Sequence, residues 1–532
     1  ATIDPEGFAR ARLILLWGSN PLSTHHHFWK FVLEARRDGA HVVVVDPVRT
    51  RTAAQADEHL APLPGTDAAL ALALMHVVLR DGAQDDAFLR DRTEGWERFR
   101  ERILAYPPER AAAICDLPVE RIEALGRRLA TTRPTAIRAT MGIQRHAGGG
   151  MALRTLAAIP AVTGDWRLPG GGLSYSTSGL FKGDTAALQR ADLRPHPVRT
   201  LSHTRLGEAL HDADPAVRAL VVYGANPLAS NPDTGQVRAG LTRDDLFTVV
   251  IEQSPTDTVD YADLVLPSTM QTEHMDVQDG YGHLYVAWNE PAVEPAGECL
   301  AHTEIWRRLA RAMGLDEPCL YDDDLTLART LVESGDPTLE GITVERLRRE
   351  GWARLGHPNP LVPFADGFPT PSGRMRLPEE EPYVPPAEGA APGEGRLALI
   401  AGASHWFLNS MFANAPEQLR RAGAAPVVAL HPDDAAARDL EDGDEVEIGN
   451  ERGAFRARLV IGQTARRGVA ATTKGHWPKL LAGGANVNAV VEERDSDLGG
   501  GAVFHDCSVW VRPVPGVPSG AAGSVSGWVP AT

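Results

Sequence analysis

The chain contains the same short pattern twice, at a constant separation of 206 residues. Residues 12–22 read RLILLWGSNPL, and residues 218–228 read RALVVYGANPL. A short apolar run that stops on Gly, Asn and Pro predicts a buried strand that ends in a tight loop. In both copies an acid lies 26 residues after the loop asparagine, Asp46 in the first and Glu252 in the second. The sequence therefore predicts an internal duplication of one β-loop-α-β-loop unit, with a period much too long for a solenoid.

The loops and acids of the two copies indicate nucleotide binding. In doubly wound α/β sheets, ligands bind beyond the carboxyl ends of the strands, where loops and helix N-termini supply backbone N–H groups. An acid after the second strand can accept hydrogen bonds from ribose hydroxyls or from the edge of a base, and Asp suits a guanine edge. Two such units predict two nucleotide-like groups, or one ligand that contains both. The alternative is that the Asn-Pro and Asp-Pro pairs serve only as turn formers.

The composition argues against several classes of function. The chain has 532 residues, enough for two to four domains, and 43% of them are hydrophobic. It contains no apolar run of about 18 residues, so we expect no membrane span. The formal net charge of −17 argues against a nucleic-acid partner, which would require a basic surface. The four cysteines form no CxxC pair, so they predict neither a disulfide framework nor a zinc or iron–sulfur site.

Shifts in composition divide the chain into segments of different character. Alternating apolar runs and helical patterns predict an α/β fold for the first two thirds, and short strands separated by turns predict a small β-barrel near the C-terminus. The predicted segments are a first dinucleotide-binding α/β domain at 1–135, a second α/β domain with the repeat at 136–355, a Pro/Gly-rich linker at 356–396, a barrel at 397–515 and an unstructured tail at 516–532.

Seven stretches, in this order, resemble the molybdopterin oxidoreductases of the dimethyl sulfoxide reductase type. Those enzymes hold molybdenum or tungsten between two molybdopterin guanine dinucleotides. The resemblance covers nearly the whole chain, and it implies two related doubly wound dinucleotide-binding domains plus a C-terminal double-psi β-barrel. The matching stretches are LLWGSNP (15–21), 42–74, TMGIQRHAGGG with the glycine turn that follows (140–172), VVYGANP (221–227), 249–274, ALIAGASHW (398–406) and 431–511.

The resemblance implies a set of cofactor-binding residues. Those around the first dinucleotide would be Trp17, Gly18, Ser19, Asn20, Pro21 and Asp46, with the turn residues Gly65, Thr66 and Asp67. Those around the second would be Gly224, Asn226, Pro227, Glu252, Gln253, Ser254 and Asp257. Met141, Gly142, Gln144 and His146 would pass near the pterins, and His405, Trp406, Asn409, Asn488 and His505 would lie where the barrel closes over the cofactor. His405 and His505 could instead be ordinary surface histidines.

The family's N-terminal segment, with its metal ligand and iron–sulfur cysteines, has no counterpart in residues 1–532. We therefore expect a [4Fe-4S] cluster only in such a segment, and we name no metal ligand and no catalytic residue here. In formate dehydrogenases of the family an Arg-bearing motif tends to follow the glycine turn, but here GGGLSYSTSG (170–179) stands there, which disfavours formate.

The function that the resemblance implies is redox chemistry on a small substrate at the metal, by transfer of an oxygen atom or of hydride and electrons. Two alternatives stay open: a non-redox hydratase or hydroxyl transferase with the same cofactor, and a metal-free electron-transfer scaffold. An isolated fragment without activity is a further possibility. We expect an iron–sulfur or other electron-transfer partner subunit, and a cytoplasmic location more readily than a periplasmic one.

Overall fold

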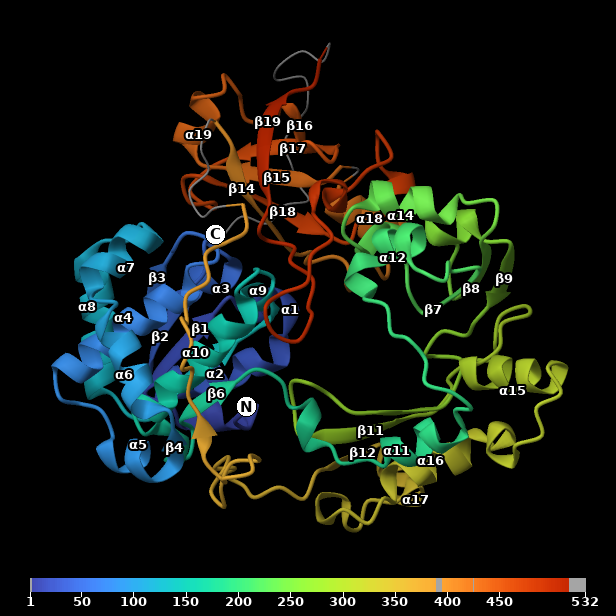
Figure 1. Cartoon of the computed structure of the whole chain (residues 1–532), viewed down its shortest axis with the longest axis horizontal. Helices are drawn as coiled ribbons and strands as arrows, with labels where there is room; N and C mark the ends of the chain where they lie inside the picture. The colour runs from blue at the N-terminus through green and yellow to red at the C-terminus, as the bar shows by residue number, and fades with distance from the viewer. Residues whose placement is uncertain (1, 389–394, 424, 516–532) are drawn as a thin grey trace.

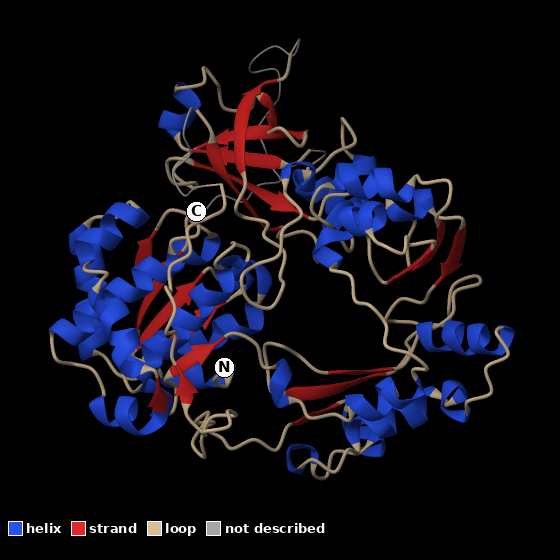
Figure 2. Cartoon of the chain, in the orientation of Figure 1, coloured by secondary structure: helices blue, strands red, loops and turns tan. Residues whose placement is uncertain are grey.

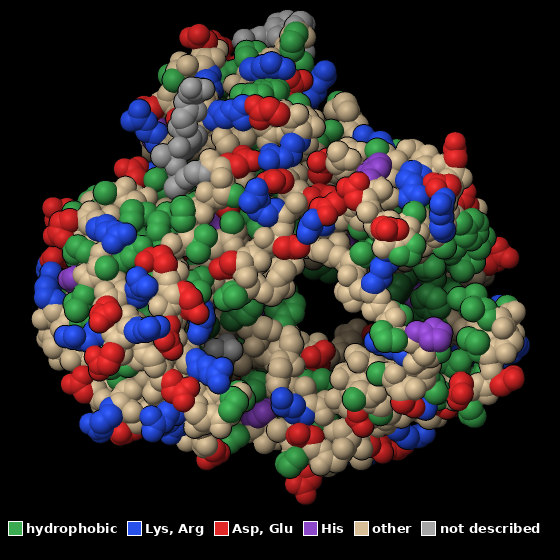
Figure 3. All heavy atoms as spheres, in the orientation of Figure 1, with side chains coloured by type: hydrophobic (Ala, Val, Ile, Leu, Met, Phe, Trp, Pro, Cys, Tyr) green, Lys and Arg blue, Asp and Glu red, His purple; other side chains and the backbone are tan. Residues whose placement is uncertain are grey.

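The computed structural model of the chain describes residues 2–388, 395–423 and 425–515. The predicted tail, 516–532, lies outside the described residues. The described part folds into three units with open sheets and one closed barrel, which surround a central opening (Figures 1 and 3). The predicted α/β class and the C-terminal barrel are confirmed.

The first unit, residues 13–174, is built on a five-stranded parallel sheet with helices on both sides (Figure 2). Its central strand β1 is buried at every position, which explains its unbroken apolar run. The strand order is β3-β2-β1-β5-β6. The strands are β1 Leu13–Trp17, β2 His41–Val45, β3 Glu58–Leu60, β5 Thr135–Ala139 and β6 Gly172–Ser174, and the helices are α1 Pro21–Thr24, α2 His26–Arg37, α3 Arg51–Gln55, α4 Asp67–Arg80, α5 Asp86–Arg92, α6 Trp96–Leu104, α7 Pro108–Cys115, α8 Val119–Thr131, α9 Met141–Gln144 and α10 Gly149–Val162.

The predicted boundary at residue 136 requires a correction. Strand β5 pairs in parallel with β1, and β6 pairs with β5, so residues 135–174 complete the first sheet. The physical reason is that β1 has a sheet neighbour on both sides, and its second neighbour comes from far along the chain. The second repeat therefore belongs to a separate unit that begins after this sheet is complete.

The second unit, residues 206–267, contains the other copy of the repeat. Its sheet has three parallel strands in the order β7-β8-β9. The register pairs Ala219 with Phe247, just as Leu13 pairs with His41 in the first unit, which is the same pairing shifted by 206 residues. Apolar side chains of this sheet reach solvent, among them Tyr223 at 56% exposure. The elements are β7 Ala219–Tyr223, β8 Phe247–Glu252, β9 Leu264–Pro267, α12 Leu206–Asp212, α13 Pro227–Ser230 and α14 Thr234–Leu241.

A third unit lies between the first two at the lower edge of Figure 1. It is a three-stranded antiparallel sheet with short helices and a small core of its own. The predicted linker then runs back across the first unit, where its strand β13 (Met375–Arg376) pairs with β4 (Thr93–Glu94). The elements of the third unit are β10 Asp276–Gln278, β11 Tyr285–Asn289, β12 Trp352–Arg354, α11 Thr185–Gln189, α16 Asp324–Val332 and α17 Val344–Glu350. Helix α15, His302–Ala312, lies instead against β7 of the second unit, where the rings of His302 and Trp306 contact Tyr223.

The barrel, residues 397–513, closes from six strands in the order β14-β18-β15-β17-β16-β19. It packs against the loop after β2: the N–H of Arg49 donates to the carbonyl of Thr464 at 2.7 Å, and Val48 bridges to Ala465. The barrel therefore covers the carboxyl ends of the first sheet. Its elements are β14 Leu397–Ala403, β15 Val427–Leu430, β16 Glu445–Gly449, β17 Ala454–Ile461, β18 Val469–Lys474, β19 Ser508–Pro513, α18 Pro416–Ala422 and α19 Pro432–Ala436.

Within the described ranges, every helix is too short or too polar to cross a bilayer.

Candidate cofactor site

The loops of the two repeats are held by the same hydrogen bonds. In the first copy the Asn20 Oδ1 accepts from the Thr52 Oγ1 at 2.7 Å, and the N–H of Leu22 donates to that hydroxyl at 3.1 Å. In the second copy the Asn226 Oδ1 accepts from the Thr258 Oγ1 at 2.9 Å. The asparagines thus lock each loop to the segment after the next strand, which explains their place in a repeated motif.

Each loop also begins with a glycine that the geometry requires. Gly18 and Gly224 have φ of +54° and +59°, in the left-handed region that side chains rarely adopt. A Cβ on Gly18 would lie 3.1 Å from the Ile143 side chain, and one on Gly142 would lie 3.2 Å from the Gly18 carbonyl oxygen. The first loop is therefore in close contact with the start of α9, the segment predicted to pass near the pterins.

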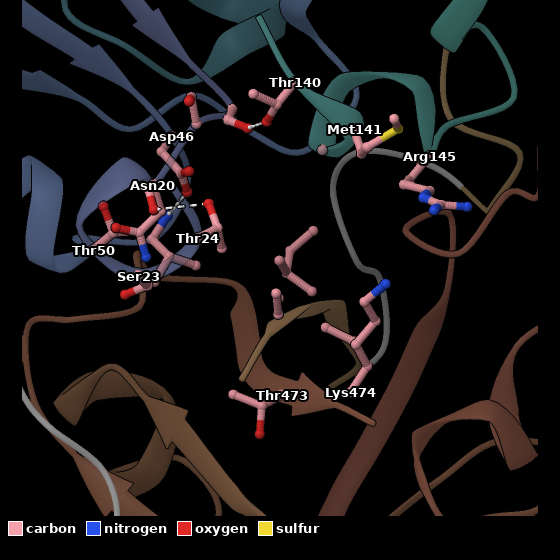
Figure 4. A pocket seen from close by; sticks show the side chains of 18 of the residues that line it. Asn20, Ser23, Thr24, Asp46, Thr50, Thr140, Met141, Arg145, Thr473 and Lys474 are labelled. Carbon is pink, nitrogen blue, oxygen red and sulfur yellow. Dashed lines mark hydrogen bonds between the residues drawn. The ribbon is translucent and has the colours of Figure 1, made fainter. Parts of the chain in front are cut away.

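A cavity of about 1100 Å³ lies between the carboxyl ends of the first sheet and the barrel (Figure 4). Its size suits a ligand larger than a typical drug-like molecule. The structure brings fifteen of the predicted residues to its wall, from both ends of the chain: Gly18, Ser19, Asn20, Pro21, Asp46, Gly65, Asp67, Met141, Gly142, His146, His405, Trp406, Asn409, Asn488 and His505.

Three predicted residues lie behind this wall and support it. Trp17 is fully buried, and its indole N–H donates to the Asp67 Oδ1 at 2.7 Å. Thr66 is the residue before α4, and its hydroxyl donates to the Leu63 carbonyl at 2.7 Å. The Gln144 Oε1 accepts a hydrogen bond from the hydroxyl of Tyr175.

The predicted residues of the second repeat do not line this cavity. They are Gly224, Asn226, Pro227, Glu252, Gln253, Ser254 and Asp257. The amide of Asn226 donates to the Asp257 Oδ2 at 3.0 Å, and the Asp257 Oδ1 accepts from the N–H of Lys479 at 2.7 Å. Asn488 joins the same interface by donating to the Ala229 carbonyl at 2.9 Å. In the structure Asp257 therefore ties the second loop to the barrel.

Basic side chains around the cavity were missed by the sequence reasoning. Of the described residues that line it, five are Arg or Lys and three are Asp, although the whole chain carries a net charge of −17. The five are Arg49, Arg51, Arg138, Arg145 and Lys474. The repeat contained one indication of them. When the sequence is shifted by 206 residues, Arg51 aligns with Asp257, which was itself predicted to bind the cofactor. Another was Lys474, one of only four lysines in the chain.

The acids of the wall are held in an environment that disfavours their charge. Burial raises the pKa of Asp46 to about 7, against the hydrogen bond that its carboxylate accepts from the N–H of Val48 at 2.9 Å. Burial also raises the pKa of Asp67. The side chains that line the cavity therefore carry a net positive charge, which favours binding of an anion.

Two predicted histidines lie together where the first unit meets the barrel. The His146 Nδ1 is 2.5 Å from the Asp506 Oδ1, and the rings of His146 and His505 are 5.6 Å apart between centroids. Burial lowers the pKa of His505 to about 3, so this ring is neutral. His405 contacts Arg51 at 3.1 Å. Neither His405 nor His505 is an isolated surface histidine.

The α/β units, the barrel and a large cavity with basic side chains in its wall are the features expected of a protein that binds a large anionic ligand. A family model described as "Molybdopterin oxidoreductase" matches residues 2–312, and one described as a molybdopterin dinucleotide binding domain matches residues 397–508. The chain belongs to the molybdopterin oxidoreductase family. It is an oxidoreductase of this family, with molybdenum or tungsten on molybdopterin guanine dinucleotides as its cofactor.

Individual relatives agree with the family models. The probable oxidoreductase YoaE of Bacillus subtilis is 36% identical over 97% of this chain and 76% of that protein. The F420-dependent formate dehydrogenase subunit alpha of Methanocaldococcus jannaschii is 27% identical over 87% of this chain and 72% of that protein. The solved structure of acetylene hydratase from Pelobacter acetylenicus shares the fold, with a TM-score of 0.78, 21% identity, and coverage of 96% and 81%.

The described residues fit the organic part of this cofactor. Gly18 and Gly142 contribute backbone to the wall, the half-buried Asp46 offers carboxylate oxygens, and the basic lining suits phosphate groups. In residues 2–388, 395–423 and 425–515, no three His, Cys, Asp or Glu side chains gather closely enough to hold a metal ion.

Proposed function

We propose that the chain transfers an oxygen atom, or hydride and electrons, to or from a small substrate. The observation that supports this proposal most is the pair of repeated loops, together with a cavity whose lining is basic. When bound, the cofactor supplies a metal that exchanges electron pairs with the substrate. The part of the protein is to bind the cofactor, orient it and keep it away from bulk water.

We assign the first dinucleotide to the cavity of the first unit. Asp46 would accept hydrogen bonds from the guanine edge, because it lies in the wall at the end of β2. Its pKa near 7 suits this role, since N–H donors on a bound base would stabilise the ionised form. Gly18 and Gly142 would support the site by letting the first loop and the start of α9 pack closely against each other.

We assign the second dinucleotide to the loops of the second unit. Glu252 occupies the position of Asp46 in the repeat, and burial raises its pKa as well. A Cβ on Gly224 would meet no atom within 4 Å, so space remains in front of this loop. Asn226 and Asp257 would act by holding the loop in place, because their polar atoms already bond to each other and to the barrel.

Metal and nucleotide analysis of the purified protein tests the proposal. We expect about one Mo or W per chain and about two guanine nucleotides after hydrolysis. Asp46→Ala and Glu252→Ala should each lower the guanine content, whereas Glu34→Ala, on the outer face of α2, should leave it unchanged. Full retention of guanine in both variants would show that the two acids are wrongly assigned.

A non-redox hydratase is the second candidate. Acetylene hydratase shares the fold at 21% identity, and this likeness extends to the fold alone. The redox proposal is favoured by the similarity to YoaE, whose name describes a probable oxidoreductase. Turnover that reduces or oxidises an added dye, one electron pair per substrate, supports the redox proposal. Turnover of substrate with no dye consumption would favour hydration.

We further propose that an iron–sulfur or other electron-transfer protein is the redox partner, and that the enzyme works in the cytoplasm. The partner proposal is supported by the chemistry, because electrons from the metal must leave the enzyme. The buried free thiols of Cys115 and Cys507 suit a reducing compartment. Cell fractionation tests the location, and iron and sulfide analysis tests the expected [4Fe-4S] cluster.

A further inference from the structure

Two basic side chains approach each other inside the cavity from different units of the molecule. Arg145 directly follows α9 in the first unit, and Lys474 is the last residue of β18 in the barrel. Both lie on the side of the pocket away from Asn20 and Asp46 (Figure 4). The charge of Arg145 is close enough to contribute to a lowered pKa of Lys474.

Neither cation is neutralised by the protein. In the part of the chain that the structure describes, the side chains of Arg145 and Lys474 form no ion pair and no hydrogen bond. The guanidinium of Arg145 lies over the ring of Phe504, at 4.8 Å from its centroid. Burial lowers the pKa of both groups, that of Lys474 to about 8. Two unpaired, half-buried like charges are costly unless an anion joins them.

The backbone around both residues is held by hydrogen bonds, so the points from which the two side chains start are fixed. The Arg145 carbonyl accepts from the N–H of His505 at 2.9 Å, and the N–H of Ala147, two residues further on, donates to the Asp506 Oδ2 at 2.8 Å. Lys474 is held by the pairing of β18 with β14, in which it is opposite Ala403. The two cations are therefore preorganised across the joint between the first unit and the barrel.

We propose that Arg145 and Lys474 form an anion-binding pair that takes one oxyanion of the phosphate class. The planar guanidinium can hold two oxygens at once, and the ammonium adds a compact charge from the barrel. Arg138 is not part of the pair, because its guanidinium already donates to the Ser174 hydroxyl and the Tyr175 carbonyl. This role of the pair rests on the proposed function. The oxyanion comes either from the cofactor's pyrophosphate or from a small anionic substrate.

Calorimetric titration of the cofactor-free chain with inorganic pyrophosphate tests the pair. Arg145→Gln and Lys474→Gln should each weaken binding at least tenfold, whereas Lys474→Arg should retain most of it. Lys30→Gln is the matched control, because Lys30 is an exposed lysine of α2. Since each Gln variant removes an uncompensated charge, its melting temperature without anions should equal or exceed that of the parent chain. Unchanged pyrophosphate affinity in both Gln variants would overturn the proposal.

The cofactor-loaded protein distinguishes the two sources of the oxyanion. If the pair holds the cofactor's pyrophosphate, both Gln variants lose guanine nucleotide, and the loaded parent protein no longer binds added pyrophosphate. If it holds a substrate, guanine content is unchanged and the loaded parent still binds sulfate, which the variants do not. Either result supports the pair. Should the protein lack Mo, W and guanine altogether, the proposed function fails, but the pyrophosphate titration still decides whether the pair binds anions.

Discussion

At the scale of one residue, the carboxyl of Asp46 should make the unfolding free energy depend on pH. Burial raises the pKa of its carboxyl to about 7, above the ordinary value near 3.9. Between these pH values the folded, cofactor-free chain keeps a proton that the unfolded chain has released. The stability that this proton contributes is complete below about pH 4 and is lost as the pH rises to about 7. Asp46→Asn should therefore flatten the decline in unfolding free energy across this window, as measured by urea denaturation at a series of pH values.

The exposed Asp38 provides the matched substitution, Asp38→Asn, which should leave the decline as it is in the parent chain. Comparison of the two variants is needed because burial also raises the pKa of Asp165, to about 6, which adds to the parent slope. If Asp46→Asn and Asp38→Asn gave the same slope, the burial of the Asp46 carboxyl would not control its proton.

At the scale of elements, the contact between α4 and α8 leaves no room at one position. Helix α4 is rich in Ala and Leu and buried on all sides, and α8 passes it with a glycine at the contact. A Cβ on Gly126 would lie 2.6 Å from the Cβ of Val77. Gly126→Ala should lower the unfolding free energy by about 1–3 kcal/mol through overpacking. Helix propensity alone would raise it by up to about 1 kcal/mol, so the sign of the change tests the contact.

A second substitution, which removes the crowding between residues 77 and 126, checks that this contact is the cause of the loss of stability. In the double variant Val77→Ala with Gly126→Ala, the new methyl group would occupy space that the valine leaves. We expect the double variant to lose less stability than the sum of the single variants, by at least about 0.5 kcal/mol in a denaturation cycle. Strict additivity would mean that the two helices adjust without contact between these side chains.

At the scale of the whole molecule, one carboxylate joins three parts of the chain. Asp506 of the barrel accepts from the His146 Nδ1 at 2.5 Å, from the Ala147 N–H at 2.8 Å and from the Ala387 N–H at 2.9 Å. Burial opposes its ionisation, but these donors hold its pKa below the usual range. Asp506→Ala should therefore destabilise the folded chain by about 3 kcal/mol or more, because it leaves buried donors unpaired.

Hydrogen exchange measures this loss where it occurs. The amides of Ala147 and Ala387 should exchange faster in Asp506→Ala, while Asp442→Ala, on the outer surface of the barrel, should leave both unchanged. Because the pKa of Asp506 is lowered, its contribution is present above about pH 4 and is lost as the pH falls through the lower folded value. Unchanged protection of both amides from exchange would show that the hydrogen bonds of Asp506 do not hold these parts of the chain together.

The sequence by itself determined the features that depend on local pattern and on register. The repeat at 206 residues predicted two equivalent strand–loop units, and the two sheets have the same strand register. The structure adds an Asn–Thr hydrogen bond that both loops share. Apolar runs predicted the parallel strands, because a strand buried on both faces has no polar positions. The acids at Asp46 and Glu252 could be named because they occupy the same position in the repeat, Asp46 directly after β2 and Glu252 as the last residue of β8.

Only the tertiary structure decided which residues meet across long distances in the chain. Strands β5 and β6 joined the first sheet, and the second repeat's loops came to lie outside the main cavity. Arg145 and Lys474 are 329 positions apart in the sequence and belong to different units, so no local pattern pairs them. Their proximity follows from how the barrel docks on the first sheet, and docking depends on packing and hydrogen bonds that sequence periodicity does not encode.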